Sequence, residues 1–365
     1  MKPETMSLLV IAGGKSSRMG TDKRWLELAG CPLLERLLQK AENEPFAEKF
    51  LCVEAVTEEL LTLANRYGFA LLTDERKNAG PMEGLRRGLQ AMTAEYALAL
   101  SCDMPFFAFS AVLPLWTAVS ADCSLQAAVA WANGRRQPLA AVYRRDMAAK
   151  FYVALEHGQH KIGAVLAAVP HRLVPLARAA CFFNVNTPAD MRLARGRLAN
   201  EMRGTPLITV SAPVSNTGKT TFIEKLIPLL REGGLRVGVV KSDCHGYTVD
   251  ARGKDSWRFS QAGAECVAVV SPNGWFMQRH TKTRESLLSV AAKMEDVDLV
   301  LIESRSHGTL PKISLWRDLG EPLIDDDTAA LFTSRRQKNY DVAQVALDDR
   351  EAAVRLVRFL IGKDS

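Results

Sequence analysis

The sequence lacks several features that would place it in a specialised class of protein. Its first apolar run, LLVIA at residues 8–12, is too short for the core of a signal peptide or for crossing a bilayer. The net charge is +6, yet no tract of lysines and arginines indicates nucleic-acid binding. We therefore expect a cytoplasmic protein that binds neither membranes nor nucleic acid.

The cysteines form no recognisable pattern. The seven cysteines are scattered, odd in number, and never form a C-x-x-C pair. This argues against a disulfide framework or a zinc site, and we expect reduced thiols. Residues 13–20 lack a true G-x-G-x-x-G, and no acidic residue is clearly placed for a ribose. A dinucleotide-dependent dehydrogenase is therefore a weak interpretation.

What is present is the composition of an ordinary globular protein. Hydrophobic residues make up 47% of the chain and charged residues 24%, so there is ample material for a core. A length of 365 residues exceeds the usual size of one α/β domain. The length therefore predicts two domains.

The first half alternates short apolar runs with segments that have helical spacing. The expected strands are 7–12, 50–55, 69–73 and 96–104, and the expected helices 32–41, 57–66 and 84–93. Such alternation predicts a mainly parallel sheet with helices on both faces. Two apolar runs within 125–143 flank Asn133-Gly134, which predicts one antiparallel hairpin in that sheet.

A charged segment ending in Gly204 and Pro206 separates the halves, and the alternation then restarts. We place the domains at 1–198 and 206–365. The second half predicts strands at 206–212, 236–243, 266–271 and 297–304, a helix at 219–232, and a last strand and amphipathic helix within 340–363. The fold class is therefore α/β, with a three-layer sandwich followed by a second α/β domain.

The stretch VIAGGKSSRMGTDK (10–23) follows the first strand with glycines and cations. Glycine lacks the Cβ that would keep a ligand from the backbone, so successive amides at Gly13-Gly14 can form an anion-binding nest. Lys15, Arg18 and Lys23 add mobile positive charge. In open α/β sheets ligands bind beyond the carboxyl ends of the strands, where this loop falls.

Other strand ends agree with an anion site. The buried run ALALSC ends in Asp103, a hard oxygen ligand suited to Mg²⁺ that carries phosphates. Asp74 lies just past the third strand and opens a glycine-containing loop that leads into a helix, a suitable place for a base and ribose.

Four segments, IAGGKSSRMGTDK, AGPMEGL, SCDMPF and FFNVNTPAD, together resemble the molybdenum cofactor guanylyltransferase family over residues 6–193. The family is one of Rossmann-like nucleotidyltransferases. The resemblance implies transfer of GMP from Mg-GTP to the phosphate of molybdopterin or Mo-molybdopterin, with release of pyrophosphate. Its implied site comprises Ala12, Gly13, Gly14 and Lys15 around the nucleotide, Arg18 at the β- and γ-phosphates, Lys23 at the α-phosphate, Asp103 at Mg²⁺, Asp74 and Gly80 at the nucleoside, and Asn184, Asn186 and Asp190 as support for the acceptor or the metal.

Three alternatives remain open for this half. Related cytidylyltransferases usually carry Ala-Ala-Gly where this chain has Ala12-Gly13-Gly14, and the pair Gly80-Pro81 also favours the guanylyl branch. Sugar-nucleotide transferases share the first loop. A regulatory GTP-binding scaffold without transfer activity is the third alternative, and the retained Arg18, Lys23 and Asp103 argue against it.

A second phosphate-type loop lies in LITVSAPVSNTGKTTF (207–222). A strand, a loop and a helix start end in Gly218-Lys219-Thr220, the second half of a P-loop, in which lysine reaches the terminal phosphates and threonine binds Mg²⁺. Pro213 stands where the first glycine is usual. The candidate loop residues are Asn216, Thr217, Gly218, Lys219, Thr220 and Thr221.

The end of the next strand supplies Lys241, Asp243 and His245, and Asp255 follows further along the chain. The strand 297–304 supplies Glu303 as a weaker Mg²⁺ partner. For His245 the residue type does not decide between a structural and a functional role.

The motifs GKTTFIEKL, GKDSWRFSQAGA and PKISL resemble the GTP-binding adaptor protein of molybdopterin guanine dinucleotide biosynthesis over residues 207–318. That family usually continues with Gly-Phe-Lys after Glu303, where this chain has Ser304-Arg305-Ser306, so GTP hydrolysis is in question. The resemblance implies GTP binding, assistance in delivering cofactor or nucleotide, and as partners a molybdenum insertion enzyme and recipient molybdoenzymes or their chaperones. A homodimer is the expected assembly.

Overall fold

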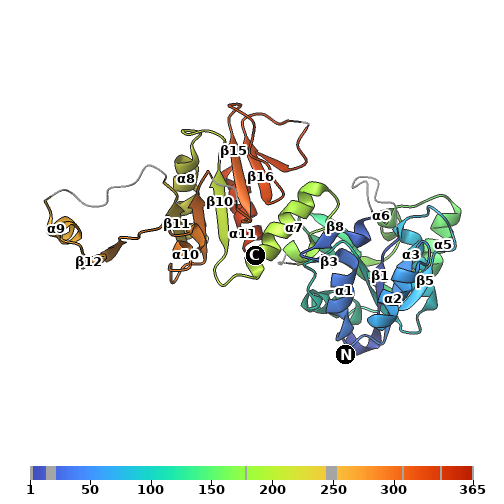
Figure 1. Cartoon of the computed structure of the whole chain (residues 1–365). Helices are drawn as coiled ribbons and strands as arrows, with labels where there is room; N and C mark the ends of the chain where they lie inside the picture. The colour runs from blue at the N-terminus through green and yellow to red at the C-terminus, as the bar shows by residue number, and fades with distance from the viewer. Residues whose placement is uncertain are drawn as a thin grey trace. The chain divides into compact units, whose positions relative to one another are not determined.

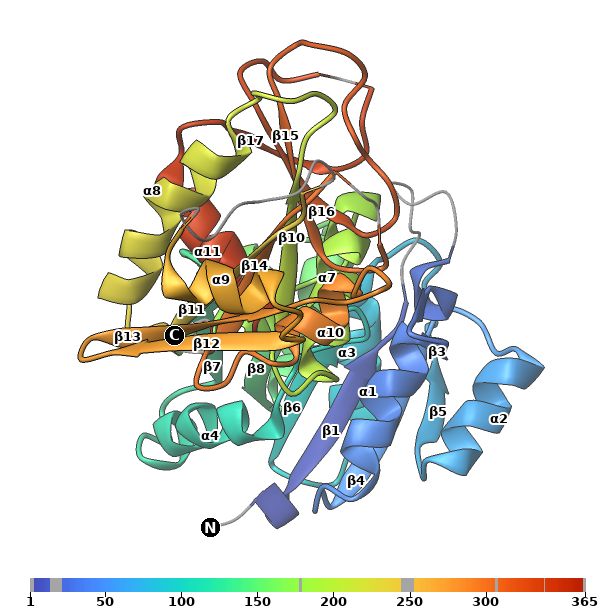
Figure 2. The same cartoon turned by 60° about the vertical axis from the view of Figure 1, so that its left-hand side comes forward.

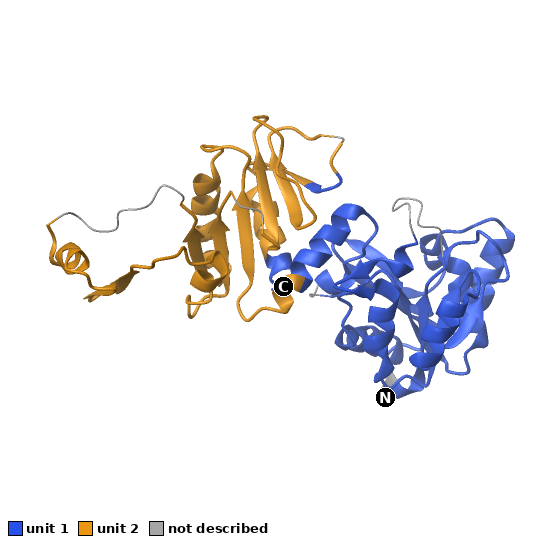
Figure 3. Cartoon of the chain, viewed as in Figure 1, with its two compact units in different colours: residues 1–198, 341–343, 358–365 blue, residues 199–340, 344–357 orange. Residues whose placement is uncertain are grey.

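The structure is a computed structural model, and it describes residues 3–13, 22–176, 179–243, 253–305, 308–337 and 339–363. The chain forms two compact units (Figure 3). Unit 1 comprises Met1–Leu198, Asp341–Ala343 and Arg358–Ser365, and unit 2 comprises Ala199–Tyr340 and Gln344–Val357. The last residues of the chain thus belong to unit 1.

In its described part, unit 1 is built around a seven-stranded sheet in the order β5-β4-β1-β6-β8-β7-β9. Its strands are β1 (Met6–Ile11), β4 (Glu48–Val53), β5 (Ala70–Thr73), β6 (Tyr96–Ser101), β7 (Ala127–Ala132), β8 (Arg135–Arg144) and β9 (His171–Pro175). The pairs β1–β4, β1–β6 and β4–β5 are parallel, so the carboxyl ends of these four strands meet at one edge. This edge carries the candidate site.

The helices of unit 1 cover both faces of the sheet (Figures 1 and 2). One core cluster packs α1 (Leu33–Glu42), α2 (Glu58–Arg66) and α4 (Val112–Ser120) on one face, and the other packs α3 (Pro81–Ala91), α5 (Met147–Glu156) and α6 (Ile162–Leu166) on the opposite face. A Cβ at Gly88 of α3 would lie 2.8 Å from the Leu9 side chain, so glycine allows α3 to approach β1 closely. The predicted three-layer α/β class is confirmed.

The predicted hairpin is also present. Strands β7 and β8 pair antiparallel, and their two-residue turn places Asn133 at φ 55° and Gly134 at φ 70°. Positive φ at both positions is the geometry that Asn-Gly turns favour, because it matches the twist of the strands. Strand β8 also pairs antiparallel with β6, whereas β7 pairs parallel with β9.

Unit 2 contains a six-stranded sheet in the order β11-β14-β10-β15-β16-β17 within its described residues. The strands are β10 (Leu207–Ser211), β11 (Val237–Lys241), β14 (Leu299–Glu303), β15 (Lys312–Trp316), β16 (Thr328–Thr333) and β17 (Ala343–Ala346). Parallel pairing of β10 with both β14 and β15 brings the segments after these three strands to one edge. The main helices are α8 (Lys219–Glu232), α10 (Leu287–Ala291) and α11 (Arg350–Leu360), the last of which continues into unit 1 from Arg358 onward.

A separate hairpin accompanies this sheet. Strand β12 (Cys266–Ser271) pairs antiparallel with β13 (Gly274–Arg279), next in the chain after α9 (Asp255–Gln261). The predicted strand 266–271 therefore exists, but its partner is β13 and not a strand of the main sheet. Helix α7 (Pro188–Glu201) ends the first part of unit 1, which runs to Leu198, and its last residues fall in unit 2.

Candidate functional site

The centre of the site in unit 1 is a short ion pair between Lys23 and Asp103. Lys23 begins a 3-10 turn, Lys23–Trp25, and Asp103 lies two residues beyond β6. The Lys23 Nζ donates to Asp103 Oδ2 over 2.6 Å. Burial lowers the pKa of Lys23, but the Asp103 carboxylate more than offsets this, so the pKa lies above its ordinary value. The structure thus joins two predicted residues that are 80 positions apart.

Asp103 also carries an unused acceptor. Its side chain is 4% exposed, and its Oδ1 is buried with no hydrogen-bond partner among the described residues. A buried carboxylate oxygen without a donor is costly, which points to a group that binds there. A hard cation such as Mg²⁺ suits an unpaired carboxylate oxygen. No cluster of three or more candidate ligands from His, Cys, Asp or Glu occurs in the described ranges.

Asp74 is the second carboxylate at this edge. It follows β5, and its backbone N–H donates to the Val53 carbonyl over 2.9 Å. A Cβ on Gly13 would lie 3.4 Å from Asp74 Oδ2, so the end of β1 directly faces this carboxylate. Burial, followed by the nearby charges of Glu83 and Glu54, raises the pKa of Asp74 to about 7. Its Oδ1 is buried and has no partner in the described part of the chain.

A buried charge network holds the loop after Asp74. Glu83 on α3 is fully buried, and its carboxylate accepts from the Glu75 backbone N–H over 3.1 Å. Arg86 binds Glu83 through its Nη2 over 2.7 Å and Glu75 over 2.6 Å. Gly80, at φ 70°, caps the start of α3. We did not predict Glu83 or Arg86, because in sequence they look like solvated helix charges.

The structure gives the predicted acceptor-side residues local partners. Asp190 Oδ2 accepts from the backbone N–H groups of Asn186 (3.0 Å) and Thr187 (2.9 Å), and Thr187 Oγ1 accepts from the Asp190 N–H (3.2 Å). This is a reciprocal cap at the start of α7. Asn184 Nδ2 donates to the Phe182 carbonyl. The Val185 N–H donates to the Asp103 carbonyl over 2.9 Å, which ties this loop to the Lys23–Asp103 pair.

The remaining predicted residues of unit 1 divide into two groups. Ala12 is buried at the end of β1, and its N–H donates to the Cys52 carbonyl over 2.8 Å. Gly14, Lys15 and Arg18 lie outside the described residues.

In unit 2 the P-loop has its expected place between β10 and α8. Gly218 caps α8 at φ 95°, a left-handed conformation that a side chain would strain. Thr217 is buried, and its hydroxyl donates to the Val214 carbonyl over 2.8 Å. Asn216, also with positive φ, completes the turn. These contacts fix the loop that delivers Lys219 to the sheet edge.

The two predicted metal partners of unit 2 meet. Thr220 Oγ1 lies 3.0 Å from Glu303 Oε1 and 3.1 Å from Oε2, so helix α8 and strand β14 converge at this point. Burial lowers the pKa of Lys219, an effect that nearby Glu303 opposes and that Arg305 and Lys241 increase. A hydroxyl and a carboxylate beside a phosphate-type lysine fit a magnesium–nucleotide site.

Not all accessory residues gather there. Lys241 ends β11, and its positive charge helps to lower the pKa of Lys219. Asp243 is exposed and lies two residues beyond Lys241. Asp255 begins α9, where its described ion pair is with Arg258 at 3.7 Å. His245 lies outside the described residues.

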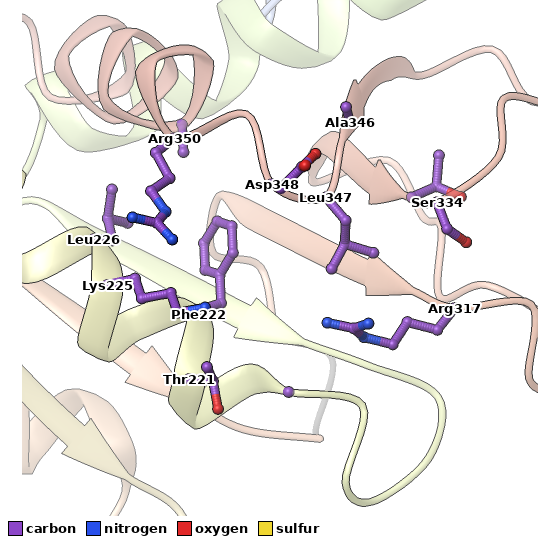
Figure 4. Close-up of a pocket in the computed structure, with 13 residues that line it drawn as sticks. Thr221, Phe222, Lys225, Leu226, Arg317, Ser334, Ala346, Leu347, Asp348 and Arg350 are labelled. Atoms are coloured by element: carbon purple, nitrogen blue, oxygen red, sulfur yellow. The ribbon is translucent and has the colours of Figure 1, made fainter.

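A pocket of about 420 Å³ borders the P-loop in unit 2 (Figure 4). It lies beside Gly218 and the first turn of α8, and the segments after β15, β16 and β17 close it. Phe222, Leu347 and Arg317 point toward its interior, with Asp348 at its border (Figure 4). The sequence analysis missed this pocket, although the carboxyl-end rule that found Asp103 also applies to Arg317 and Asp348.

These sites define the class of the protein: an α/β nucleotidyltransferase unit joined to a P-loop unit. Residues 8–173 match the family model of the MobA-like NTP transferase domain, and residues 207–334 match that of molybdopterin guanine dinucleotide synthesis protein B.

Individual relatives agree with both matches. A probable molybdenum cofactor guanylyltransferase of Chloroflexus aggregans is 33% identical over 208 residues, which is 53% of this chain and 95% of that protein. The molybdopterin-guanine dinucleotide biosynthesis adapter protein of Escherichia coli is 36% identical over 154 residues, 40% of this chain and 87% of that protein.

A solved structure of molybdopterin-guanine dinucleotide biosynthesis protein A from Archaeoglobus fulgidus is 24% identical, with a TM-score of 0.47, and covers 54% of this chain and 100% of its own.

The chain belongs to the molybdenum cofactor guanylyltransferase family in its first half and to the adapter family of molybdopterin guanine dinucleotide biosynthesis in its second. It is a nucleotidyltransferase of molybdenum cofactor biosynthesis. Among the described residues, no helix is long and apolar enough to span a bilayer.

Proposed function

We propose that unit 1 transfers GMP from GTP to the terminal phosphate of molybdopterin at the Lys23–Asp103 edge. An oxygen of the acceptor phosphate attacks the α-phosphorus of GTP and forms a new P–O–P linkage. The bond from the α-phosphorus to the bridging oxygen breaks, and pyrophosphate leaves with the electron pair. The acceptor phosphate is already ionised at neutral pH, so the reaction needs positioning and charge neutralisation and no general base.

The observation that supports this proposal is the short Lys23–Asp103 pair with its unpartnered, buried Oδ1. Asp103 would hold Mg²⁺, which supplies positive charge to the triphosphate. Lys23 would contact the α-phosphate, where negative charge increases in the transition state. Lys23 stays protonated throughout the working pH range, because the pKa of its ammonium group lies above the ordinary value. Arg18 and the Gly13–Lys15 segment would bind the remaining phosphates.

Asp74 would contact the nucleoside. It faces Gly13 at the sheet edge, and the carboxylates of Glu54 and Glu83 lie near enough to raise its pKa. An ionised carboxylate accepts both the N1–H and the N2–H of guanine, whereas the corresponding edge of cytosine lacks this pair of donors. We therefore assign guanine selection to Asp74.

Unit 2 would bind a second GTP with its triphosphate on the P-loop and its guanosine in the adjoining pocket. Lys219, Thr220 and Glu303 would hold the phosphates and Mg²⁺. The pocket combines the apolar side chains of Phe222 and Leu347 with the carboxylate of Asp348, the arrangement expected for a stacked guanine. The bound state would assist delivery of cofactor or nucleotide. A short tether between two such modules raises their mutual concentration to roughly the millimolar range.

The test is the rate of pyrophosphate release from GTP in the presence of Mg²⁺ and molybdopterin-bearing acceptor. We expect Asp103→Asn to reduce this rate by about 100- to 1,000-fold, as for other electrostatic stabilisers of transition states. The neighbouring Cys102→Ala substitution serves as the control, because the Cys102 thiol is buried and has no proposed role. Near-normal turnover by Asp103→Asn, with thermal unfolding unchanged, would contradict the assignment.

A further inference from the structure

Arg317 lies beside the P-loop because of how β15 is paired. Strand β15 runs parallel to β10, with Ser314 opposite Ser211. Arg317 follows the last residue of β15, so it leaves the sheet at the same edge as the residues after Ser211. The register therefore brings an arginine from a distant part of the chain to the phosphate-binding loop.

The contact between Arg317 and the loop is direct. Arg317 Nε donates to the Thr217 carbonyl over 2.9 Å. A Cβ added to Gly218 would lie 3.5 Å from Arg317 Nη2, so the guanidinium lies against the last glycine of the loop. Within the described chain, the guanidinium makes no other hydrogen bond and no ion pair, Asp348 of the same pocket included. Its Nη groups face the pocket (Figure 4).

The P-loop of unit 2 lacks one backbone N–H donor, and an arginine beside it could supply donors in its place. Pro213 stands where a P-loop usually has its first glycine, and proline has no N–H to donate to a phosphate. An arginine held through Nε keeps four N–H donors on its Nη atoms in a fixed planar fork. That geometry matches two oxygens of one phosphate.

We propose that Arg317 binds the α-phosphate of the nucleotide held by unit 2, an inference that rests on the proposed binding of GTP there. Glu303 and Thr220 mark the side of the loop where Mg²⁺ and the terminal phosphates would lie. Arg317 instead lines the pocket together with Thr221 and Phe222, on the side proposed for the nucleoside. The α-phosphate is the phosphate that joins these two regions.

The experiment is calorimetric titration of GTP and GDP into the full chain carrying Lys23→Ala. This substitution weakens the proposed nucleotide site of unit 1, so the tight binding that remains is expected at the P-loop of unit 2. Adding Lys219→Ala should abolish that binding and so assigns it to unit 2. Adding Arg317→Gln instead should weaken GTP and GDP by a similar factor, about 10- to 100-fold, since both nucleotides carry the α-phosphate. The dependence of Kd on salt should also become shallower, because one cation is lost.

The variants separate ligand binding from support of the loop. Glutamine can still donate to the Thr217 carbonyl but has no charge, so normal affinity and an unchanged salt dependence in Arg317→Gln would overturn the proposal. A loss confined to GTP would also overturn it, because that result indicates the γ-phosphate. Arg236→Ala is the matched control and should leave both affinities unchanged, since Arg236 precedes β11 and pairs with Asp298. If the Lys23→Ala chain binds no GTP, the proposed function of unit 2 fails, and this inference fails with it.

Discussion

Two carboxylates at the same sheet edge of unit 1 differ in their electrostatic surroundings. Asp103 has a lysine 2.6 Å away, whereas Asp74 has burial and two other carboxylates near it. The charges on Arg86 and Arg87 lower the pKa of Asp74 only in part, and it remains raised to about 7. Asp103 is thus held in an ion pair with Lys23, whereas Asp74 titrates in the physiological range.

This difference predicts a pH dependence for GTP. Only the ionised Asp74 carboxylate accepts both guanine N–H groups, so the KM for GTP should fall as the pH rises from about 6 to 8, through a pKa of about 7. Asp74→Asn should raise KM and remove most of that dependence. The measurement is KM for GTP from initial rates across this range. An equal slope in Asp74→Asn and in the unchanged chain would contradict the role of Asp74.

The raised pKa of Asp74 also affects the stability of the fold, and a rise in pH, which favours GTP binding, lowers this stability. Because the folded-state pKa of Asp74 lies above the unfolded value of 3.8, the folded state binds more protons between the two values. The contribution of Asp74 to stability is therefore complete below about pH 4 and is lost as the pH rises to about 7. Without GTP, Asp74→Asn should unfold at the same or a higher temperature than the unchanged chain at pH 8, a difference that shrinks at pH 5.

The site residues predicted from sequence were those at the ends of apolar runs. Asp103 was found because it follows a buried apolar run at the carboxyl end of a strand, and Lys23 as a cation of the glycine-containing loop after the first strand. Glu83 and Arg317 were not predicted. Glu83 is fully buried and bound to Arg86 and the Glu75 backbone, although in sequence it looks like a solvated helix charge. Arg317 owes its position to the Thr217 carbonyl, 100 residues away in the chain. Lys312 of the PKISL motif is similar, since it is fully buried and paired with Asp325.

At the scale of elements, most strands and helices were predictable, and so was the pairing of β7 with β8 across the Asn133-Gly134 turn, whereas pairing between strands distant in sequence was not. Apolar periodicity is local, so α1, α2 and α8 appear close to their expected bounds. Strand β12 illustrates the limit, because its sequence predicts a strand but cannot show that β13 is its partner. The central position of β15, between β10 and β16, likewise depends on register with distant residues.

Helix α7 carries a prediction that separates structure from catalysis. The Asp190 carboxylate caps this helix through three contacts of 2.9–3.0 Å with residues 186 and 187. Asp190→Ala should therefore destabilise the protein by about 1 kcal/mol, the usual cost of a lost cap. If capping is its whole role, kcat for GMP transfer should stay within about twofold when measured below the unfolding range. A tenfold loss of kcat in the folded variant would instead support a part in acceptor or metal binding.

At the scale of the whole molecule, the two compact units do not simply follow the order of the chain. Phe359 belongs to unit 1, where its ring centroid lies 4.7 Å from that of Phe183 and 6.1 Å from that of Phe106. The guanidinium of Arg197 lies 5.2 Å from the Phe359 ring centroid. The domain limits of 1–198 and 206–365 remain a prediction from composition, which cannot show such a return of the chain.

This arrangement predicts that the end of the chain stabilises the transferase. Phe359→Ala should lower the temperature at which GMP transfer is lost by about 2–4 °C, equivalent to about 1 kcal/mol in a unit of this size. Phe259→Ala is the matched control, since Phe259 on α9 is 59% exposed and should have no effect. Equal inactivation temperatures for the two variants would show that Phe359 adds nothing to unit 1.

The most direct test of the account is pyrophosphate release by the full chain from GTP, CTP and ATP in turn, with Mg²⁺ and molybdopterin-bearing acceptor under anaerobic conditions. The account predicts GTP-selective release that is lost in Lys23→Ala and persists in Lys219→Ala, which places transfer in unit 1. Release with CTP preferred over GTP, or none with any of the three nucleotides, would contradict guanylyl transfer at the Lys23–Asp103 edge.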